Sequence, residues 1–155
     1  MNEQNYNALR IENQLCFPLY ACSREVIKQY KPYLDEMDLT YTQYIVMLAL
    51  WEYKNMTVKE LGDILYLDSG TLTPLLKKLE AKGYVTRTRS HKDERNLIVS
   101  ATAQGMKLRE EAIKMPGAIA ENTLLTQEET VTLYKLLYKI LARVDERYEH
   151  ERDKN

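Results

Sequence analysis

The sequence predicts a mainly α-helical protein with a small β-wing, arranged as a winged helix-turn-helix. Glycine and proline are scarce, with five and four residues among 155, and no β-rich run is long. Two helical segments separated by a short turn precede two strand segments that are joined by a basic loop. A helix of this kind fits the major groove of DNA, and a basic hairpin fits the minor groove and the phosphates.

The positive charge of the chain is concentrated in this part. Residues 69–97 contain seven lysines and arginines against three acidic residues, a net charge of +4, whereas the whole chain carries −1. The remainder therefore carries about −5, so attraction for a polyanion is confined to one surface. An ordinary solvated face is the alternative, but the coincidence of helix pair, hairpin and charge favours a DNA-binding surface.

The first helix is expected over about residues 13–33, where apolar residues recur at helical spacing. Pro18 interrupts this pattern, because a proline inside a helix removes a backbone hydrogen bond. The helix therefore either begins near Cys16 or bends at Pro18.

The next two helices are short. The second follows Thr42 and ends near residues 54–55. The third begins at Thr57, where Glu60 three residues later completes a capping-box pattern, and extends through Leu65.

The fourth helix has two candidate starts. Asp68 or Ser69 caps it, or Thr73 caps it and places Pro74 in the first turn. Gly83 ends the helix. The strands of the wing follow at residues 84–88 and 96–100, with the tip of the hairpin at 90–95.

Two further helices follow the wing. One begins at Thr102 and is broken or bent at Pro116–Gly117, and the last begins at Thr126. The last helix carries an apolar stripe made of Leu133, Leu136, Leu137, Ile140, Leu141 and Val144. Long helices at both ends of a small domain have little core of their own to cover, which indicates a homodimer. We expect one domain, residues 1–155, with a winged-helix core at about 40–100 and dimerisation helices at about 13–33 and 102–150.

The fourth helix and the wing supply the candidate DNA-binding residues. The short side chains of the helix let the backbone approach base edges and phosphates, two lysines flank the duplex, and the arginines serve the wing. Asp93 is expected to hold Arg95 through a charge-assisted hydrogen bond. The candidates are Ser69, Gly70, Thr71, Thr73, Lys77, Lys78, Arg87, Arg89, Asp93 and Arg95.

The chain resembles the MarR family of repressors and, within it, the organic-hydroperoxide-responsive OhrR group. Three segments carry the resemblance: residues 67–77 in the fourth helix, residues 93–96 in the wing, and residues 13–20 around Cys16. The similarity covers the chain up to about Gly117. It implies a homodimer that binds a palindromic operator in double-stranded DNA, with interlocked terminal helices and an organic hydroperoxide as signal.

Cys16 is the candidate redox sensor, because a thiolate near the amino end of a helix gains stabilisation from the helix dipole and from hydroxyl donors. Twelve tyrosines against one phenylalanine provide such donors and an apolar wall for a lipid-like peroxide. The resemblance implies that Tyr30 and Tyr41 of the other subunit hydrogen-bond the cysteine, with Tyr20 close by. A small buried cysteine among core tyrosines is the alternative, and for Cys22 burial is the preferred interpretation.

No cysteine follows Cys22, so an intersubunit disulfide with a distal resolving cysteine is excluded. This places the chain with the one-cysteine type, in which a small cellular thiol forms a mixed disulfide with the oxidised sensor or the sensor overoxidises. Cys16 and Cys22 themselves lie on different sides of a helix and are not expected to bridge. Pro18, which follows the sensor closely, departs from the family pattern.

Two other functions compete with a peroxide-sensing repressor. One is a regulator of the SarZ and MgrA type that responds to other oxidants, thiol conjugation or a phenolic ligand. The other is a thiol peroxidase, but the residues before Cys16 lack the peroxiredoxin loop. The two histidines, His91 and His150, lie in the wing and the charged tail, so we expect no enzyme, metal site or cofactor.

The chain is expected to be cytoplasmic. Its amino terminus is polar and has no secretory signal pattern, and the longest apolar run, residues 44–51, is too short to span a bilayer.

Overall fold

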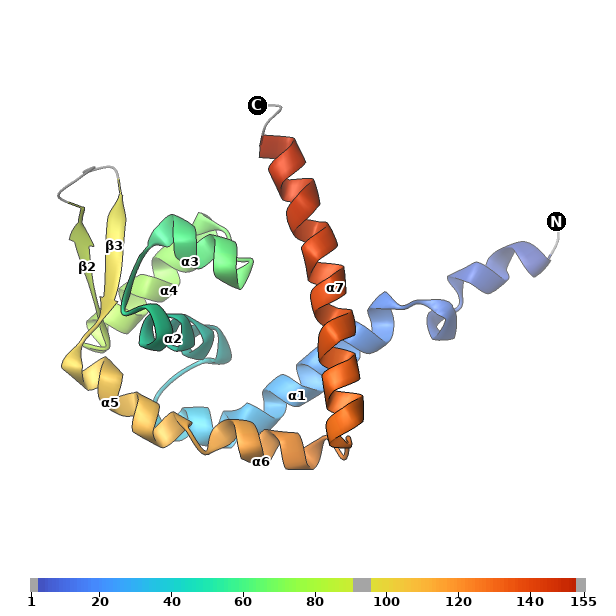
Figure 1. Ribbon diagram of the computed structural model, residues 1–155, viewed down its shortest axis with the longest axis horizontal. Helices are drawn as coiled ribbons and strands as arrows, with labels where there is room; N and C mark the ends of the chain where they lie inside the picture. Colours follow the sequence, from blue (N-terminus) through green and yellow to red (C-terminus); the bar gives the residue numbers. More distant parts are fainter. Residues whose placement is uncertain (1–2, 91–95, 153–155) are drawn as a thin grey trace. The chain divides into compact units, whose positions relative to one another are not determined.

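The computed structural model describes residues 3–90 and 96–152. The described residues form two compact units, one up to Met115 and one from Pro116 onward. The first unit contains the winged helix together with an amino-terminal segment that extends away from it (Figure 1). The second contains most of α6 and all of the last helix, α7. No helix in the described ranges is long and apolar enough to cross a membrane.

Two short 3-10 helices, Glu3–Leu9 and Ile11–Asn13, precede helix α1, Cys16–Glu36. Because α1 begins at Cys16, Pro18 lies in the first turn, where its missing N–H has no intrahelical acceptor to lose. Of the two predicted alternatives, the structure therefore confirms the start near Cys16. A second proline, Pro32, lies inside α1.

Capping boxes set the starts of the next two helices. Thr40 caps α2, Tyr41–Tyr53, and exchanges hydrogen bonds with Gln43. Thr57 caps α3, Val58–Leu65, and the Glu60 carboxylate accepts from the Thr57 backbone N–H at 2.7 Å. The capping box at Thr57 and the end at Leu65 are confirmed, whereas α2 begins slightly before the predicted Thr42.

Helix α4, Ser69–Ala81, is capped by Asp68, so the alternative start at Thr73 is wrong. Pro74 lies within the helix and removes one backbone donor. Gly83 ends the helix with a φ of +75°, a left-handed conformation that favours glycine. The N–H of Gly83 donates to the carbonyl of Glu80 and that of Tyr84 to Leu79, which is the Schellman pattern.

The sheet has three strands in the order β1-β3-β2, all antiparallel. Strands β2, Val85–Arg89, and β3, Leu97–Ala101, form the predicted wing. Strand β1, Asn55–Thr57, pairs with β3 and was not predicted, because three residues are too few to show an alternating pattern.

Helix α5, Ala103–Ala112, is capped by Thr102, and α6 follows as Met115–Asn122. The break therefore lies before Pro116, which occupies the first turn of α6, and not at Pro116–Gly117 as predicted. In the second unit, α7, Gln127–Arg152, begins with Thr126 accepting from the N–H of Glu129 at 3.2 Å.

The core of the first unit joins the carboxy-terminal end of α1 to α2, α4, the sheet and α5. Where β2 begins, helix α5 crosses the backbone so closely that a Cβ at Gly105 would lie 2.1 Å from the carbonyl oxygen of Tyr84. The indole N–H of Trp51 donates to the Gly105 carbonyl at 2.9 Å. The hydroxyl of Thr102 donates to the Gly83 carbonyl at 2.6 Å. Thr102 thus holds the turn between α4 and β2, and Trp51 holds α5 against α2.

We predict that Gly105→Ala lowers the free energy of unfolding by about 1–3 kcal/mol, because the added methyl group meets backbone that cannot rotate away. Gly117→Ala is the matched control: a Cβ at Gly117 would meet nothing within 4 Å, so this change should be neutral or slightly stabilising, by up to about 1 kcal/mol. Urea denaturation of both variants measures the difference, and equal stabilities would contradict the close packing at Gly105.

Candidate functional site

Helix α4 separates its polar and apolar faces sharply. Its predicted DNA-contacting residues are all exposed: Ser69, Gly70, Thr71, Thr73, Lys77 and Lys78. The opposite face is buried in the core through Leu72, Leu75, Leu76 and Leu79. The leucines fix the rotation of the helix, so the short polar side chains and the lysines share the solvent-facing side.

The first turn of α4 is organised by Asp68. Its carboxylate accepts from the backbone N–H of Thr71 at 2.8 Å and from the Thr71 hydroxyl at 3.1 Å. The backbone hydrogen bond from Thr71 is the main reason why the pKa of Asp68 is lowered. A Cβ at Gly70 would lie 3.0 Å from the same carboxylate, so this turn is compact.

The turn of the helix-turn-helix contains a residue that sequence reasoning missed. A Cβ at Gly62 would lie 2.7 Å from the carbonyl oxygen of Leu67, so α3 needs glycine where the turn folds back over it. Tyr66, at the end of α3, adopts a left-handed conformation with a φ of +54°. The only sequence signal for this approach is a glycine in the middle of an amphipathic helix.

The wing is attached to α4 by Arg87. Its Nε donates to the Glu80 carboxylate at 3.0 Å, and only 18% of the arginine side chain is exposed. This hydrogen bond is the first cause of the lowered pKa of Glu80. Arg89 is exposed at the end of β2. The predicted Asp93 and Arg95 lie outside the described residues.

Cys16 is the first residue of α1, and its side chain is exposed in the single chain. The expectation that it lies at the amino end of a helix is therefore confirmed. Cys22 is also exposed, although burial was the preferred interpretation for it. Both are free thiols, as their positions on the helix predicted.

The predicted tyrosines fall into two separate places. Tyr30 and Tyr41 pack edge to face, with ring centroids 5.3 Å apart, and both contact Tyr44. Burial raises the pKa of all three phenols, that of Tyr44 to about 12, so they are neutral hydrogen-bond donors.

Tyr20 lies one helical turn after Cys16 and is 60% exposed. Its hydroxyl accepts from Arg24 at 3.1 Å, and the same guanidinium lies 5.4 Å from the ring centroid. Sequence reasoning missed Arg24, whose only signal is its spacing of four residues from Tyr20.

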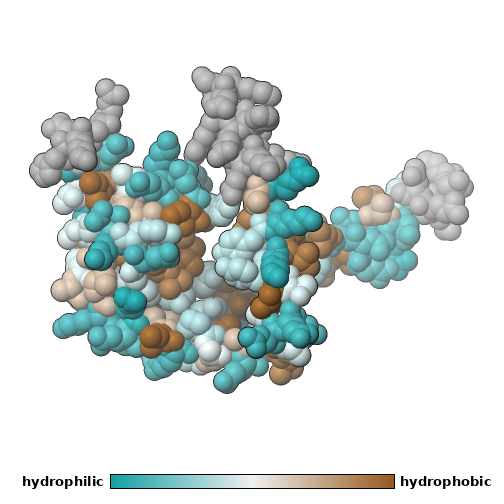
Figure 2. Space-filling view, in the orientation of Figure 1, coloured by the Kyte–Doolittle hydropathy of each residue, from teal (hydrophilic) through white to brown (hydrophobic). Residues whose placement is uncertain are grey.

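One chain does not bring Cys16 and the Tyr30–Tyr41 pair together. Cys16 begins α1, whereas Tyr30 lies in its second half and Tyr41 begins α2. Fourteen helical residues correspond to about 21 Å between Cys16 and Tyr30. Around Cys16 the chain exposes large apolar residues, including Leu15 at 70% and Phe17 at 45%. Figure 2 shows hydrophobic side chains open at the surface of this amino-terminal segment. A pocket of cysteine and tyrosines therefore requires a second chain.

Comparison with known families decides the class of protein. Residues 28–112 match the family model described as transcriptional regulator SarA/Rot. The chain belongs to this family of regulators. It is 46% identical over 145 residues to the organic hydroperoxide resistance transcriptional regulator of Bacillus subtilis (strain 168), a match that covers 94% of this chain and 99% of the relative. The predicted membership of the MarR type and its organic hydroperoxide group is confirmed.

Other relatives agree with this assignment. The regulator is 56% identical over 108 residues to the transcriptional regulator SarZ of Staphylococcus aureus (strain USA300), covering 70% of each chain. Reduced AbfR bound to DNA superimposes with a TM-score of 0.74 at 36% identity, covering 92% of this chain and 99% of that one. A mutant MarR from E. coli complexed with operator DNA gives 0.72 at 27% identity, covering 82% and 93%. The winged-helix fold is confirmed, and these relatives are regulators and not enzymes, as predicted.

We predict that the Glu80–Arg87 pair stabilises the regulator above acidic pH only. Because the folded-state pKa of Glu80 is lowered from 4.5, the unfolded chain binds the proton more readily. The stabilisation is therefore complete above pH 4.5 and is lost as the pH falls through the folded-state value. Glu80→Gln should unfold at lower urea than wild type at pH 7, and the difference should shrink toward pH 3.

The control is Glu110→Gln, which changes an exposed glutamate on α5. A difference between wild type and Glu80→Gln that stays constant across this pH range would show that the ion pair does not stabilise the fold.

Proposed function

We propose that this protein is a DNA-binding repressor that releases its operator when an organic hydroperoxide oxidises Cys16. The observation that carries the proposal is the exposed Cys16 thiol at the amino end of α1, in the same chain as an α4 whose polar face is free for DNA. The relative named as an organic hydroperoxide resistance regulator supports the proposed signal, and the relative named as reduced AbfR bound to DNA supports the proposed DNA binding.

Binding to double-stranded DNA would place α4 in the major groove. Ser69, Gly70, Thr71 and Thr73 on its exposed face would approach bases and phosphates, and Lys77 and Lys78 would flank the duplex. Arg89, Asp93 and Arg95 would serve the wing. Arg87 would act mainly by holding the wing on α4 through Glu80.

The regulator would bind a palindromic operator as a homodimer. Helix α7 exposes a stripe that includes Leu133 at 44%, Leu136 at 54% and Ile140 at 43%. Apolar faces of this extent on long helices are covered by a partner in symmetric dimers. The same assembly would bring Cys16 of one chain to Tyr30 and Tyr41 of the other, with Tyr20 near the site.

The chemical step begins with the Cys16 thiolate, which attacks one oxygen of the peroxide. The O–O bond breaks, the sulfur loses two electrons to become a sulfenic acid, and the alkoxide takes up a proton and leaves as an alcohol. A small thiol then displaces water from the sulfenic acid and leaves a mixed disulfide. This cycle requires a reducing compartment, so we place the protein in the cytoplasm.

Oxidation of Cys16 would change its hydrogen bonds with the tyrosine hydroxyls. The two α1 helices would shift, and with them the spacing of the two α4 helices on the operator. The second candidate is a regulator of the SarZ type that responds to other oxidants, thiol conjugation or a phenolic ligand. The 56% identity to SarZ of Staphylococcus aureus favours it.

We predict that stoichiometric organic hydroperoxide lowers operator affinity of wild type and Cys22→Ser at least tenfold and leaves Cys16→Ser bound. Removal of the thiol removes the only nucleophile at the start of α1 among its described residues. Fluorescence anisotropy with a labelled operator measures the affinity. Release of Cys16→Ser by peroxide would exclude Cys16 as the switch, and release by hydrogen peroxide or salicylate alone would favour the second candidate.

We further predict that Lys77→Gln and Lys78→Gln reduce the salt dependence of operator binding. Each phosphate that the protein no longer neutralises lowers the slope of log affinity against log salt by about 0.9, and a substitution in both chains of a dimer affects two phosphates. Lys107→Gln on α5 is the control, because it removes the same charge from a residue on another helix. Equal slopes for all three variants would place α4 away from the phosphates.

A further inference from the structure

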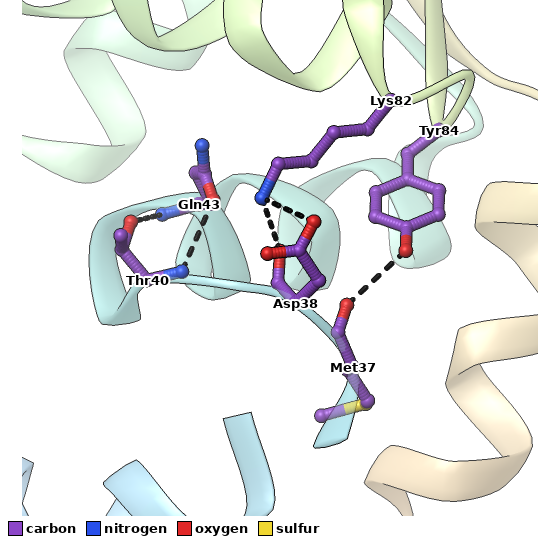
Figure 3. A network of polar contacts seen from close by, with 6 residues as sticks. All are labelled: Met37, Asp38, Thr40, Gln43, Lys82 and Tyr84. Carbon is purple, nitrogen blue, oxygen red and sulfur yellow. Dashed lines mark hydrogen bonds and ion pairs between the residues drawn. The ribbon is translucent and has the colours of Figure 1, made fainter. Parts of the chain in front are cut away.

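The corner that follows α1 is joined to the segment between α4 and β2 by the side chains of Lys82 and Tyr84, through three contacts that no sequence motif predicts (Figure 3). The Lys82 ammonium donates to the backbone carbonyl of Asp38 and forms an ion pair with its carboxylate at 3.0 Å. The Tyr84 hydroxyl donates to the carbonyl of Met37 at 3.2 Å. We call these four residues, Met37, Asp38, Lys82 and Tyr84, the α1 latch.

The α1 side of the latch is a tight corner. Asp38 has a φ of +51°, and its N–H donates to the carbonyl of Asp35 at 3.1 Å. Met37 and Leu39 on either side of it are buried at 3% and 6% exposure. Because the corner is anchored by these two side chains, its carbonyl groups are presented in one fixed direction toward Lys82 and Tyr84 (Figure 3).

The other side of the latch lies between the two DNA-binding elements. Lys82 is the cap residue that follows α4, and Tyr84 immediately precedes β2. Backbone hydrogen bonds hold both ends of this segment: the N–H of Lys82 donates to the carbonyl of Lys78, and the N–H of Thr102 donates to the carbonyl of Tyr84. A displacement of Lys82 or Tyr84 therefore moves the end of α4 and the base of the wing together.

The exposed fractions of the Asp38 and Lys82 side chains show that the latch fixes the position of the two segments and adds little to the stability of the fold. The Asp38 side chain is 77% exposed and the Lys82 side chain 26%. An ion pair with one partner so exposed contributes little to the free energy of folding. Polar contacts from two side chains across the same pair of segments do, however, restrict how one segment can turn against the other.

The latch also lies far from the sensor. Helix α1 has 21 residues, which correspond to about 30 Å of rise, and Cys16 is at its first residue while the latch follows its last. Pro32 removes one backbone hydrogen bond between these two ends, and the rest of the helix connects a shift at Cys16 with a shift at the corner.

We propose that Lys82 and Tyr84 are positioning residues that transmit the position of α1 to the recognition helix and the wing. When α1 shifts at its Cys16 end, the Met37–Asp38 corner shifts with it, and its contacts with Lys82 and Tyr84 move the α4–β2 segment. The inference rests on the proposed function, because it assigns the route by which oxidation of Cys16 weakens operator binding.

The test measures the ratio of operator dissociation constants, oxidised over reduced, in a Cys22→Ser background. Lys82→Met removes both contacts of the ammonium, Tyr84→Phe removes one hydroxyl, and the double variant removes the latch. We expect the ratio to fall by about 2-fold to 30-fold in the double variant. Lys82→Arg keeps a donor and should retain part of the ratio that Lys82→Met loses.

Lys78→Met is the charge-matched control: we expect it to lower operator affinity in both states and to leave the ratio unchanged.

A second measurement does not depend on peroxide. Operator DNA should change the rate at which iodoacetamide alkylates Cys16 in the parent and in Lys78→Met, and not in the double latch variant, because coupling between the two sites acts in both directions. Urea denaturation shows whether the variants remain folded, and the conservative Tyr84→Phe retains most of the packing of the ring.

The outcomes separate the two proposals. An unchanged ratio in a folded double variant, or an operator effect on alkylation that survives in it, overturns the latch. Peroxide could fail to release the parent from operator DNA while operator DNA still changes the alkylation rate of Cys16 in the parent and not in the double latch variant. In that case the proposed signal is wrong and the coupling through the latch stands. The latch is also overturned if operator DNA does not change the alkylation rate of Cys16 in the parent.

Discussion

The close approach of α5 to the segment between α4 and β2 is the constraint on which the rest of the first unit depends. Gly105 has no room for a side chain against Tyr84, and Gly83 needs its positive φ to turn the chain out of α4. The Trp51 indole and the Thr102 hydroxyl bind the backbone at this crossing. These groups fix where α4 ends and where the wing begins, so they also fix the angle between the two elements that would meet DNA.

The charges of α4, the turn after it and the wing have two different roles. Lys77 and Lys78 project from the exposed face, whereas Lys82 turns back to the α1 corner and Arg87 to Glu80. The two inward-turned cations hold the elements in place and leave less charge for phosphates than the net charge of the segment indicates. An electrostatic surface counted from sequence alone therefore overstates the number of cations free for DNA.

The proposed sensor would be divided in another way, between two chains. Cys16 and Tyr20 lie at the exposed start of α1, and Tyr30 and Tyr41 lie in an aromatic cluster near its other end. Neutral phenols with raised pKa values suit the stabilisation of a sulfur anion by donation. Since one α1 helix cannot fold back on itself, the proposed sensor needs a second chain, as the proposed binding to a palindromic operator does.

The sequence by itself determined the winged helix, because its signals are local: capping at Thr57, glycine at Gly83, leucine spacing in α4 and alternation in the wing each act within a few residues. It also predicts Cys16 as the redox sensor and the polar face of α4 as the DNA-contacting surface. Only the tertiary structure decided that Asp68 caps α4 and that β1 joins the sheet. It likewise decided that Arg87 pairs with Glu80 and Lys82 with Asp38. These outcomes depend on contacts between residues distant in sequence or on choices between equivalent caps, and no local pattern records which partner lies within hydrogen-bonding distance.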